Sequence, residues 1–321
     1  MAQLGLGMAS LGRPGYINLG HGQDLKNHSI SAVRNNAFEV LNKAWQSGIR
    51  HFDMARSYGR AEEFVSQWIK DESISPQEIT LSSKWGYTYT AAWKVQTPDG
   101  VAHEVKRHEL PVLKRQYSSS LSQLGEHLKL YQIHSATQES GVLENPAVLQ
   151  FLNRIRQTGT SIGLSVSGPG QPETIEKALT IKVDGEHLFQ SVQATWNLLE
   201  RSAEDALQKA HDLGLKVIIK ESVANGRLTS RNQTADFRRR HDRLSQLADQ
   251  EETTMDAISI AAALNRPWAA TVLSGATTVD QLASNITATT LTWSDELETQ
   301  TAKIAETPDE YWNSRAKLDW N

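Results

Sequence analysis

Four residues have the types and the spacing of a proton-transfer site: Asp53, Tyr58, Lys84 and His134. Each lies at or just after the end of an apolar run with the composition of a β-strand. A lysine ammonium lowers the pKa of a neighbouring phenol, and an aspartate carboxylate holds that ammonium in place. The histidine can hold a substrate oxygen beside the phenol. Together the four residues predict a general acid.

Each of the four residues also has an ordinary structural interpretation. Alone, Asp53 is typical of a turn or helix cap, and Tyr58 of a half-buried packing residue. Lys84 alone suits a solvated strand end, and His134 a hydrogen-bonded core histidine. All four, however, follow three successive predicted strands at the same end. One fold would therefore bring them side by side, which favours the functional interpretation.

Strand-like runs alternate with helix-like segments along the whole chain. The expected strands cover residues 4–8, 51–54, 79–83, 128–134, 160–166, 189–195, 215–220 and 269–275. The expected helices cover residues 36–47, 60–70, 146–157, 172–179, 203–213, 255–264 and 279–286. This alternation predicts a parallel sheet covered by helices. Eight strands favour a closed (β/α)8 TIM barrel, α/β in class, over an open doubly wound sheet, with residues 1–321 forming one domain.

Two loops are longer than simple connections require, namely residues 85–110 and 224–240. Loops of such length are usually functional or mobile, and both are expected at the catalytic face of the barrel. The C-terminal tail, residues 306–321, is rich in aromatic residues and is expected to pack near the barrel mouth. Aromatic residues expected to line an apolar substrate pocket are Trp85, Tyr87, Trp196 and Trp312.

Composition restricts the classes of partner. The formal net charge of −4 gives no general reason to bind nucleic acid or an anionic membrane. No apolar run approaches the roughly 20 residues that would span a bilayer, and the N-terminus lacks the pattern of a secretory signal. The sequence contains no cysteine, so thiolate chemistry and disulfides are excluded. These features predict a cytoplasmic protein with a small-molecule substrate; they do not reveal its oligomeric state.

Several segments resemble motifs of the aldo-keto reductases. The segment DMARSYGRAE at 53–62 carries the aspartate and the tyrosine of that family's catalytic tetrad. Further similarity lies in SSKW at 82–85, YQIH at 131–134, GLS at 163–165, QATWN at 193–197 and LSGATTVDQLASN at 273–285. The resemblance covers most of the chain, from the first strand to Asn285.

The resemblance implies an NAD(P)H-dependent oxidoreductase that reversibly reduces an aldehyde or ketone to an alcohol. Tyr58 would donate the proton to the carbonyl oxygen, and Lys84 would lower the pKa of its phenol. Asp53 would pair with Lys84, and His134 would orient the carbonyl. The hydride must come from a cofactor, because no side chain supplies one.

The family binds its cofactor across the barrel mouth, and the resemblance implies NADP(H) ahead of NAD(H). The positions that match its cofactor contacts are Met8, Ala9, Ser165, Gln193, Lys220, Gly275, Thr277, Gln281, Ser284 and Asn285. The segment from Gly275 to Asn285 matches the adenosine-phosphate site, where a helix N-terminus suits an anion. No metal is expected.

The sequence departs from the family at both ends of the expected cofactor site. Val166 stands where many members have an asparagine that binds the carboxamide, and Ser167 is a candidate replacement. Lys220 stands where an aromatic residue commonly stacks on the nicotinamide. Gln281 and Ser284 replace an arginine and a glutamate, so that position lacks a guanidinium for the 2′-phosphate.

Two other functions fit part of the pattern. A metal-dependent hydrolase could use His51, Asp53 and His134, but the sequence shows no paired-ligand spacing such as H-x-H. A cofactor-binding regulatory subunit with little turnover could use the same fold. The intact tetrad favours an enzyme over such a subunit.

Overall fold

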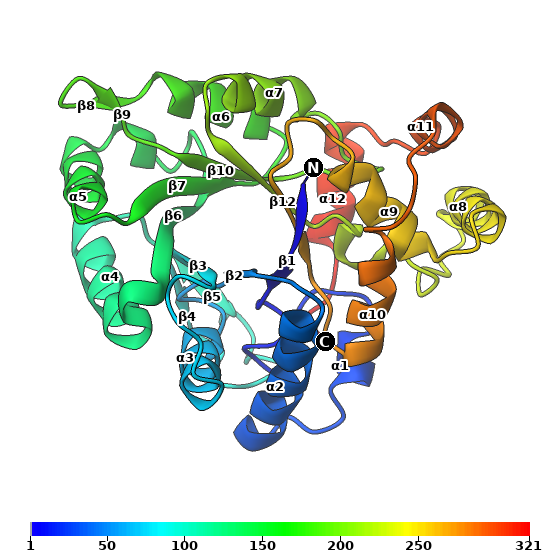
Figure 1. Ribbon diagram of the computed structural model, residues 1–321, viewed down its shortest axis with the longest axis horizontal. Helices are drawn as coiled ribbons and strands as arrows, with labels where there is room; N and C mark the ends of the chain where they lie inside the picture. The colour runs from blue at the N-terminus through cyan, green and yellow to red at the C-terminus, as the bar shows by residue number, and fades with distance from the viewer. Residues whose placement is uncertain (1) are drawn as a thin grey trace.

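Eight parallel strands close into a barrel in the computed structural model, which describes residues 2–321 (Figure 1). Around the barrel the strand order is β1-β12-β11-β10-β7-β6-β3-β2, and β2 closes the ring against β1. The strands are β1 (Gln3–Gly7), β2 (His51–Asp53), β3 (Thr80–Trp85), β6 (Leu128–Ala136), β7 (Ser161–Val166), β10 (Ser191–Thr195), β11 (Lys216–Lys220) and β12 (Thr271–Ser274). The predicted TIM barrel and all eight predicted strands are confirmed.

Helices form a ring outside the barrel (Figure 1). They are α1 (His21–Asp24), α2 (Ile30–Gln46), α3 (Ala61–Asp71), α4 (Leu110–Leu124), α5 (Pro146–Gln157), α6 (Gln171–Thr180), α7 (Glu204–Asp212), α8 (Arg238–Gln250), α9 (Met255–Leu264), α10 (Val279–Thr287), α11 (Asp295–Ala302) and α12 (Pro308–Ala316). Seven were expected, with α5 and α9 at the predicted bounds. None of the described helices is long and apolar enough to cross a membrane.

Side-chain caps set where several helices begin. Asn145 accepts a hydrogen bond from the Val148 amide and is followed by Pro146, the combination that favours the first turn of α5. Helix α2 begins at Ile30, earlier than predicted, because the Ser29 side chain accepts from the Ala32 amide. A local polar cap thus extends this helix beyond its apolar stripe.

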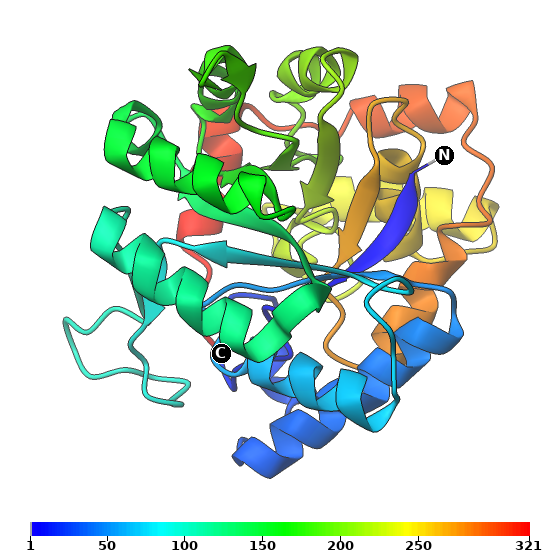
Figure 2. The ribbon, with the colours of Figure 1, turned by 60° about the vertical axis from the view of Figure 1, so that its left-hand side comes forward.

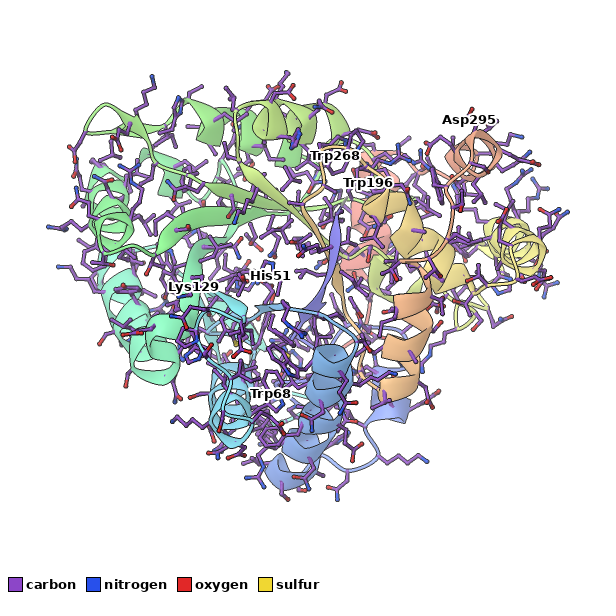
Figure 3. All side chains as sticks on the ribbon, viewed as in Figure 1. His51, Trp68, Lys129, Trp196, Trp268 and Asp295 are labelled. Atoms are coloured by element: carbon purple, nitrogen blue, oxygen red, sulfur yellow. The ribbon has the colours of Figure 1, made fainter. Side chains whose placement is uncertain are left out.

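Large aromatic side chains fill the space between the barrel wall and the helices. The rings of Trp196 and Trp268 meet edge to face with centroids 5.7 Å apart, and both side chains are buried (Figure 3). Trp68 of α3 packs likewise on Phe52 of β2. This layer holds the helices on the strands, so the carboxyl ends of the strands have fixed positions.

The long loop at residues 85–110 is a hairpin formed by β4 (Tyr87–Tyr89) and β5 (Glu104–Lys106). It extends from the barrel beside the C-terminus of the chain (Figure 2). The C-terminal residues contact it directly: Gln96 donates to the Trp320 carbonyl at 2.7 Å, and the His103 and Trp320 rings stack at 4.1 Å. A second hairpin, β8 (Lys182–Val183) with β9 (Glu186–His187), lies elsewhere in the chain.

Candidate active site

The carboxyl ends of β2 and β3 place Asp53 and Lys84 in direct contact. The Lys84 ammonium forms an ion pair with one carboxylate oxygen of Asp53 and donates to the Met54 carbonyl at 2.9 Å. The other oxygen of Asp53 accepts from Ser82 at 2.7 Å and from Gln193 at 3.1 Å. Lys84 is fully buried, so its charge depends on this carboxylate for stabilisation.

Tyr58 lies above this ion pair, on the loop between β2 and α3. The Lys84 ammonium is 5.0 Å from the centroid of the Tyr58 ring. The His134 ring meets the Tyr58 ring edge to face with centroids 5.5 Å apart. A second cation, the Arg13 guanidinium, lies 5.4 Å from the same ring. The structure therefore brings all four predicted residues together.

The pKa of Tyr58 is raised well above its ordinary value, contrary to the sequence-based expectation of a lowered one. Burial is the largest cause, and the Asp53 carboxylate adds to it, whereas Arg13 acts in the opposite direction. The Lys84 ammonium lies 5.0 Å from the ring centroid but is paired with Asp53, whose carboxylate acts to raise the pKa of Tyr58. In this structure the phenol therefore stays protonated at neutral pH.

The pKa of His134 is lowered well below its ordinary value, because the ring is buried and the Lys84 and Lys220 cations lie nearby. A neutral imidazole carries one N–H donor, which suits it to hold a carbonyl oxygen. Its Nδ1 atom is buried and has no hydrogen-bonding partner in the described part of the chain. The ring also packs against Tyr87, with centroids 4.8 Å apart.

An irregularity at the end of β6 directs His134 into the site. The β6–β7 register shifts between Ile133 and Ala136, and Ser135 has a φ of 49°, in the left-handed region. The Ser135 amide donates to the Ser165 hydroxyl at 2.9 Å, which stabilises this conformation. Such irregularities often reorient a side chain beside an active site.

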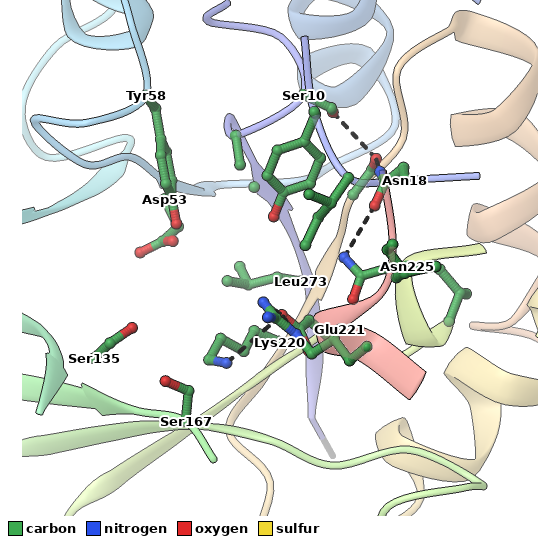
Figure 4. Close-up of a pocket in the computed structure, with 18 of the residues that line it drawn as sticks. Ser10, Asn18, Asp53, Tyr58, Ser135, Ser167, Lys220, Glu221, Asn225 and Leu273 are labelled. Atoms are coloured by element: carbon green, nitrogen blue, oxygen red, sulfur yellow. Dashed lines mark hydrogen bonds and ion pairs between the residues drawn. The ribbon is translucent and has the colours of Figure 1, made fainter. Parts of the chain in front are cut away.

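Asp53, Tyr58 and His134 border a pocket of 320 Å³ at the carboxyl ends of the strands, which we call the catalytic pocket (Figure 4). In Figure 4, Tyr58 and Asp53 lie on one side of it, and Lys220 and Glu221 lie on the other. Of the predicted cofactor residues, Ala9, Gln193, Lys220 and Gly275 line this pocket, as does Ser167. Of the remaining predicted cofactor residues, Met8 is buried, and Ser165 is buried with its hydroxyl bonded to the Ser135 amide.

Only one of the four predicted substrate residues lines the catalytic pocket. Tyr87 does so from the hairpin, beside His134. Trp85 and Trp196 are fully buried in the layer behind the strands, and Trp312 lies behind Lys220, with the Lys220 ammonium 6.0 Å from its ring. None of these three lines the catalytic pocket. For Trp85 the reason is that neighbouring residues of a strand face opposite sides. With Lys84 facing the barrel interior, Trp85 must face the helices.

Arg13 and its partners form a wall that the sequence did not indicate. The Arg13 guanidinium is buried and bonds Glu104 of β5 at 3.0 Å and the Ser57 carbonyl at 2.9 Å. The Trp320 ring covers it, with its centroid 4.7 Å away. The pairing partners are distant in sequence, so no local pattern points to them.

The C-terminal tail completes this wall. Asn321 exchanges two backbone hydrogen bonds with Tyr16, each of 3.1 Å, and its side-chain oxygen accepts from the Gly22 amide at 2.8 Å. Leu318 and Trp320 line the pocket next to this contact. Three separate segments, the loop after β1, the hairpin and the tail, thus enclose one side of the pocket.

A second charged cluster lies opposite Tyr58, at the end of β11. Lys220 donates to the Thr195 hydroxyl at 2.7 Å, and the Glu221 carboxylate lies 3.9 Å away. Arg315 of α12 donates from Nε to both oxygens of Glu221 at 3.0 Å. Burial lowers the pKa of Lys220 to about 8, although Glu221 acts in the opposite direction. The cluster thus joins the barrel to the C-terminal helix.

Glu221 is expected to make stability depend on pH at the acid end. Burial alone raises the pKa of Glu221, but the Arg315 and Lys220 charges outweigh it and hold the pKa at about 2, below the ordinary 4.5. The ionised Glu221 carboxylate therefore contributes its full stabilisation of the folded state above about pH 4.5, and this contribution is lost as the pH falls towards about 2. Glu221→Gln should lower the free energy of unfolding by about 3 kcal/mol at neutral pH, because it leaves Arg315 without its carboxylate.

Urea unfolding of wild type and Glu221→Gln between neutral pH and pH 3 measures this effect. The difference between the two proteins should shrink as the pH falls. Glu144→Gln is a matched control because the Glu144 carboxylate is largely exposed in its pair with Lys177. A constant difference across the range would show that the charge of Glu221 is not the cause.

A second pocket, of 290 Å³, continues from the first. The two share Asn18, Val223 and Gly275 as lining residues. The predicted adenosine-site residues Thr277, Gln281, Ser284 and Asn285 line this second pocket, which we call the distal pocket. The predicted cofactor residues therefore fall along one continuous cleft, apart from Met8 and Ser165.

Two of the three residues of the metal-hydrolase alternative already have partners within the protein. His51 contacts Ser82 at 2.9 Å and Thr271 at 3.4 Å from inside the ring of strands (Figure 3). Asp53 bonds Lys84, as described above. Across residues 2–321, no three histidine or acidic side chains are grouped as a metal site requires.

A closed (β/α)8 barrel with these four residues at the carboxyl ends of its strands has the architecture of an aldo-keto reductase. Comparison with known proteins agrees: residues 3–306 match the Aldo/keto reductase family. The chain belongs to this family, and it is therefore an oxidoreductase. Members of the family use nicotinamide cofactors and small-molecule substrates.

The relatives are distant. The chain is 24% identical over 281 residues to an uncharacterized oxidoreductase, YqkF, of Bacillus subtilis, covering 81% of this chain and 84% of that one. It is 24% identical over 276 residues to a norsolorinic acid reductase of Aspergillus flavus, covering 81% and 69%. An aldo-keto reductase from Bacillus halodurans, solved in its holo form, shares the fold with a TM-score of 0.69 at 20% identity, covering 95% of this chain and 92% of that one.

The cleft has room for a cofactor where backbone borders it. A Cβ added at Gly275 would have only the side-chain nitrogen Nδ2 of Asn18 within 4 Å, at 3.9 Å. A Cβ added at Gly7 would have only the Ser274 carbonyl, at 3.5 Å. Both glycines line the catalytic pocket, so side chains there would occupy the space of a bound molecule. The residues present therefore fit a nicotinamide dinucleotide.

Proposed function

We propose that the protein reduces an aldehyde or ketone to an alcohol, reversibly, with a nicotinamide cofactor. The observation that carries the proposal is the contact of the Tyr58 ring with His134 and Lys84 at one end of a continuous cleft, formed by pockets of 320 and 290 Å³. When bound, the reduced nicotinamide supplies the hydride. The protein supplies the proton and the geometry.

Tyr58 acts as the proton donor in this proposal. Hydride addition places negative charge on the carbonyl oxygen, and a donor already in position stabilises that charge. The raised pKa of Tyr58 supports the role because it keeps the phenol protonated until an oxygen of higher basicity forms. In the reverse direction the same oxygen takes the proton back.

His134, Lys84 and Asp53 position the substrate carbonyl and stabilise the charge that develops during the reaction. The neutral His134 ring holds the carbonyl oxygen next to the phenol. The Lys84 ammonium, fixed by Asp53, provides positive charge beneath the ring of Tyr58 as the phenolate forms. The neighbouring Arg13 lowers the pKa of Tyr58, against the larger effect of burial, and so also stabilises the phenolate as it forms.

The cofactor would lie along the cleft with its reacting end at Tyr58. Gln193 and Ser167 border the catalytic pocket and carry the polar groups that a carboxamide requires. The family resemblance implies NADP(H) ahead of NAD(H), and the carbonyl-reductase type of substrate. The choice between the two cofactors depends on the distal pocket.

An assay of the purified protein with both reduced cofactors and a panel of aldehydes, ketones and sugars tests the proposal. We expect substrate-dependent loss of the absorbance of the reduced nicotinamide, and oxidation of the corresponding alcohols in the reverse direction. Tight cofactor binding without turnover across the panel would instead indicate a cofactor-binding regulatory subunit.

A further inference from the structure

The distal pocket continues from the catalytic pocket, so the far end of an extended dinucleotide would lie in it. The hydride-donating end of the dinucleotide must lie at Tyr58, in the catalytic pocket. That pocket continues into the distal pocket past Asn18, Val223 and Gly275. This assignment rests on the proposed function. The side chains of the distal pocket then decide whether the adenosine ribose carries a hydroxyl or a phosphate.

Acidic side chains outnumber basic ones among the residues that line the distal pocket. Asp24, Asp256 and Asp280 contribute carboxylates, and Arg231 contributes the one guanidinium. Arg231 is already paired: its two terminal nitrogens bond the two oxygens of Asp24 at 2.7 and 2.6 Å. A 2′-phosphate would therefore meet an excess of negative charge and a neutralised guanidinium.

The neutral donors at the distal pocket are committed to the same carboxylates. Gln281 donates to Asp24 at 2.8 Å. Ser284 and Asn285 donate to Asp256 at 2.8 and 2.6 Å. These are the positions at which the resemblance implied contacts to a phosphate, but here their hydrogen bonds go to carboxylate oxygens.

The N-terminus of α10 is also occupied by the protein's own side chains. The Thr278 hydroxyl accepts from the Gln281 amide at 3.2 Å, and the Gln281 side-chain oxygen accepts from the Thr277 amide at 2.8 Å. Asp280 adds an acidic side chain to the first turn. The positive end of the helix is thus partly neutralised before any anion binds.

We propose that the distal pocket selects a free ribose 2′-hydroxyl, so that the protein prefers NAD(H) to NADP(H). Carboxylates accept hydrogen bonds from a ribose hydroxyl, the arrangement that distinguishes NAD sites in other dinucleotide-binding folds. The same carboxylates repel a phosphate at that position. Asp24 and Asp256 are the specificity-determining residues, and Asp24 also withholds Arg231 from a phosphate.

Calorimetric titration with ADP-ribose and 2′-phospho-ADP-ribose tests the preference directly. Neither probe contains nicotinamide, so binding is read without catalysis. The full-length protein should bind ADP-ribose at least about tenfold more tightly than the phosphorylated probe. Asp24→Asn should tighten binding of the phosphorylated probe at least about fivefold, because it frees Arg231 and removes one negative charge. It should not tighten binding of ADP-ribose, because the ribose hydroxyl then faces a neutral amide instead of a charged acceptor.

Two further variants provide a second test of the carboxylates and a control. Asp256→Asn should also favour the phosphorylated probe, which keeps the test valid if Asp24→Asn does not fold. Asp99→Asn, on the exposed tip of the β4–β5 hairpin, is the matched control and should change neither affinity.

The outcomes separate this inference from the proposed function. Equal or tighter binding of 2′-phospho-ADP-ribose to the wild type would overturn the NAD preference and leave the reductase assignment intact. Binding of neither probe would overturn the cofactor site, and the proposed function with it. Steady-state kcat/KM values with NADH and NADPH should show the same ratio as the two affinities.

Discussion

Replacing Tyr58 with phenylalanine is expected to lower kcat for carbonyl reduction by about 10²–10⁴-fold, the range that a positioned general acid contributes. The substitution removes one hydroxyl and keeps the ring that contacts His134 and Lys84. Cofactor affinity should stay within about twofold, because no charge changes and the hydroxyl is the only group lost. Turnover and cofactor titration on the same preparation measure both effects.

Tyr117→Phe is the matched control for this prediction. Tyr117 lies on α4 and packs against Tyr131 and Phe151, away from the catalytic pocket, so loss of its hydroxyl should leave kcat unchanged. A Tyr58→Phe enzyme with near wild-type kcat would show that another group donates the proton. The four-residue site would then have to be reassigned.

Replacing Lys84 with methionine is expected to damage both stability and catalysis. The substitution leaves the Asp53 carboxylate buried without its cation. Losing one partner of a buried pair typically costs about 3–5 kcal/mol in the free energy of unfolding. In addition, kcat should fall by at least about 100-fold, because no cation then lies beneath the forming phenolate. Urea unfolding and steady-state kinetics measure the two effects separately.

The double variant Asp53→Asn/Lys84→Met separates the structural from the catalytic role. It removes both charges, so most of the lost stability should return. Activity should stay low, because the cation is still absent. Recovery of activity together with stability would mean that the ion pair serves only the fold. Lys209→Met, in the exposed pair with Glu176, should cost no more than about 1 kcal/mol and serves as the control.

The barrel could be predicted because each of its strands is a short, separate apolar run. Five helices were missed, and the two longest of them, α4 and α8, were missed for opposite reasons of composition. Helix α4 contains Pro111 and a run of serines, which favour helix weakly, and it depends on buried contacts of residues such as Leu113 and Leu124. Helix α8 is mostly charged and buries only Leu244, Leu247 and Ala248. Tertiary packing rather than local propensity stabilises both.

The catalytic residues could be predicted because they follow strands whose ends must meet. The rest of the site could not, since its contacts join distant parts of the chain: Arg13 with Glu104, and Glu221 with Arg315. Strand alternation would have excluded Trp85, since Lys84 already faced the interior. The direction of the Tyr58 pKa shift depends on burial, which residue types alone do not reveal.

The link between Glu221 and Arg315 has a consequence for redesigning substrate scope. Both side chains border the catalytic pocket, yet together they fasten α12 to the barrel. Many substitutions at these two positions would therefore cause misfolding, so few variants of a mutant library would remain to be screened for a new substrate. Ile17 and Leu318 border the same space with aliphatic side chains, which can be enlarged or trimmed without unfastening the helix. Evolution in the laboratory should begin there.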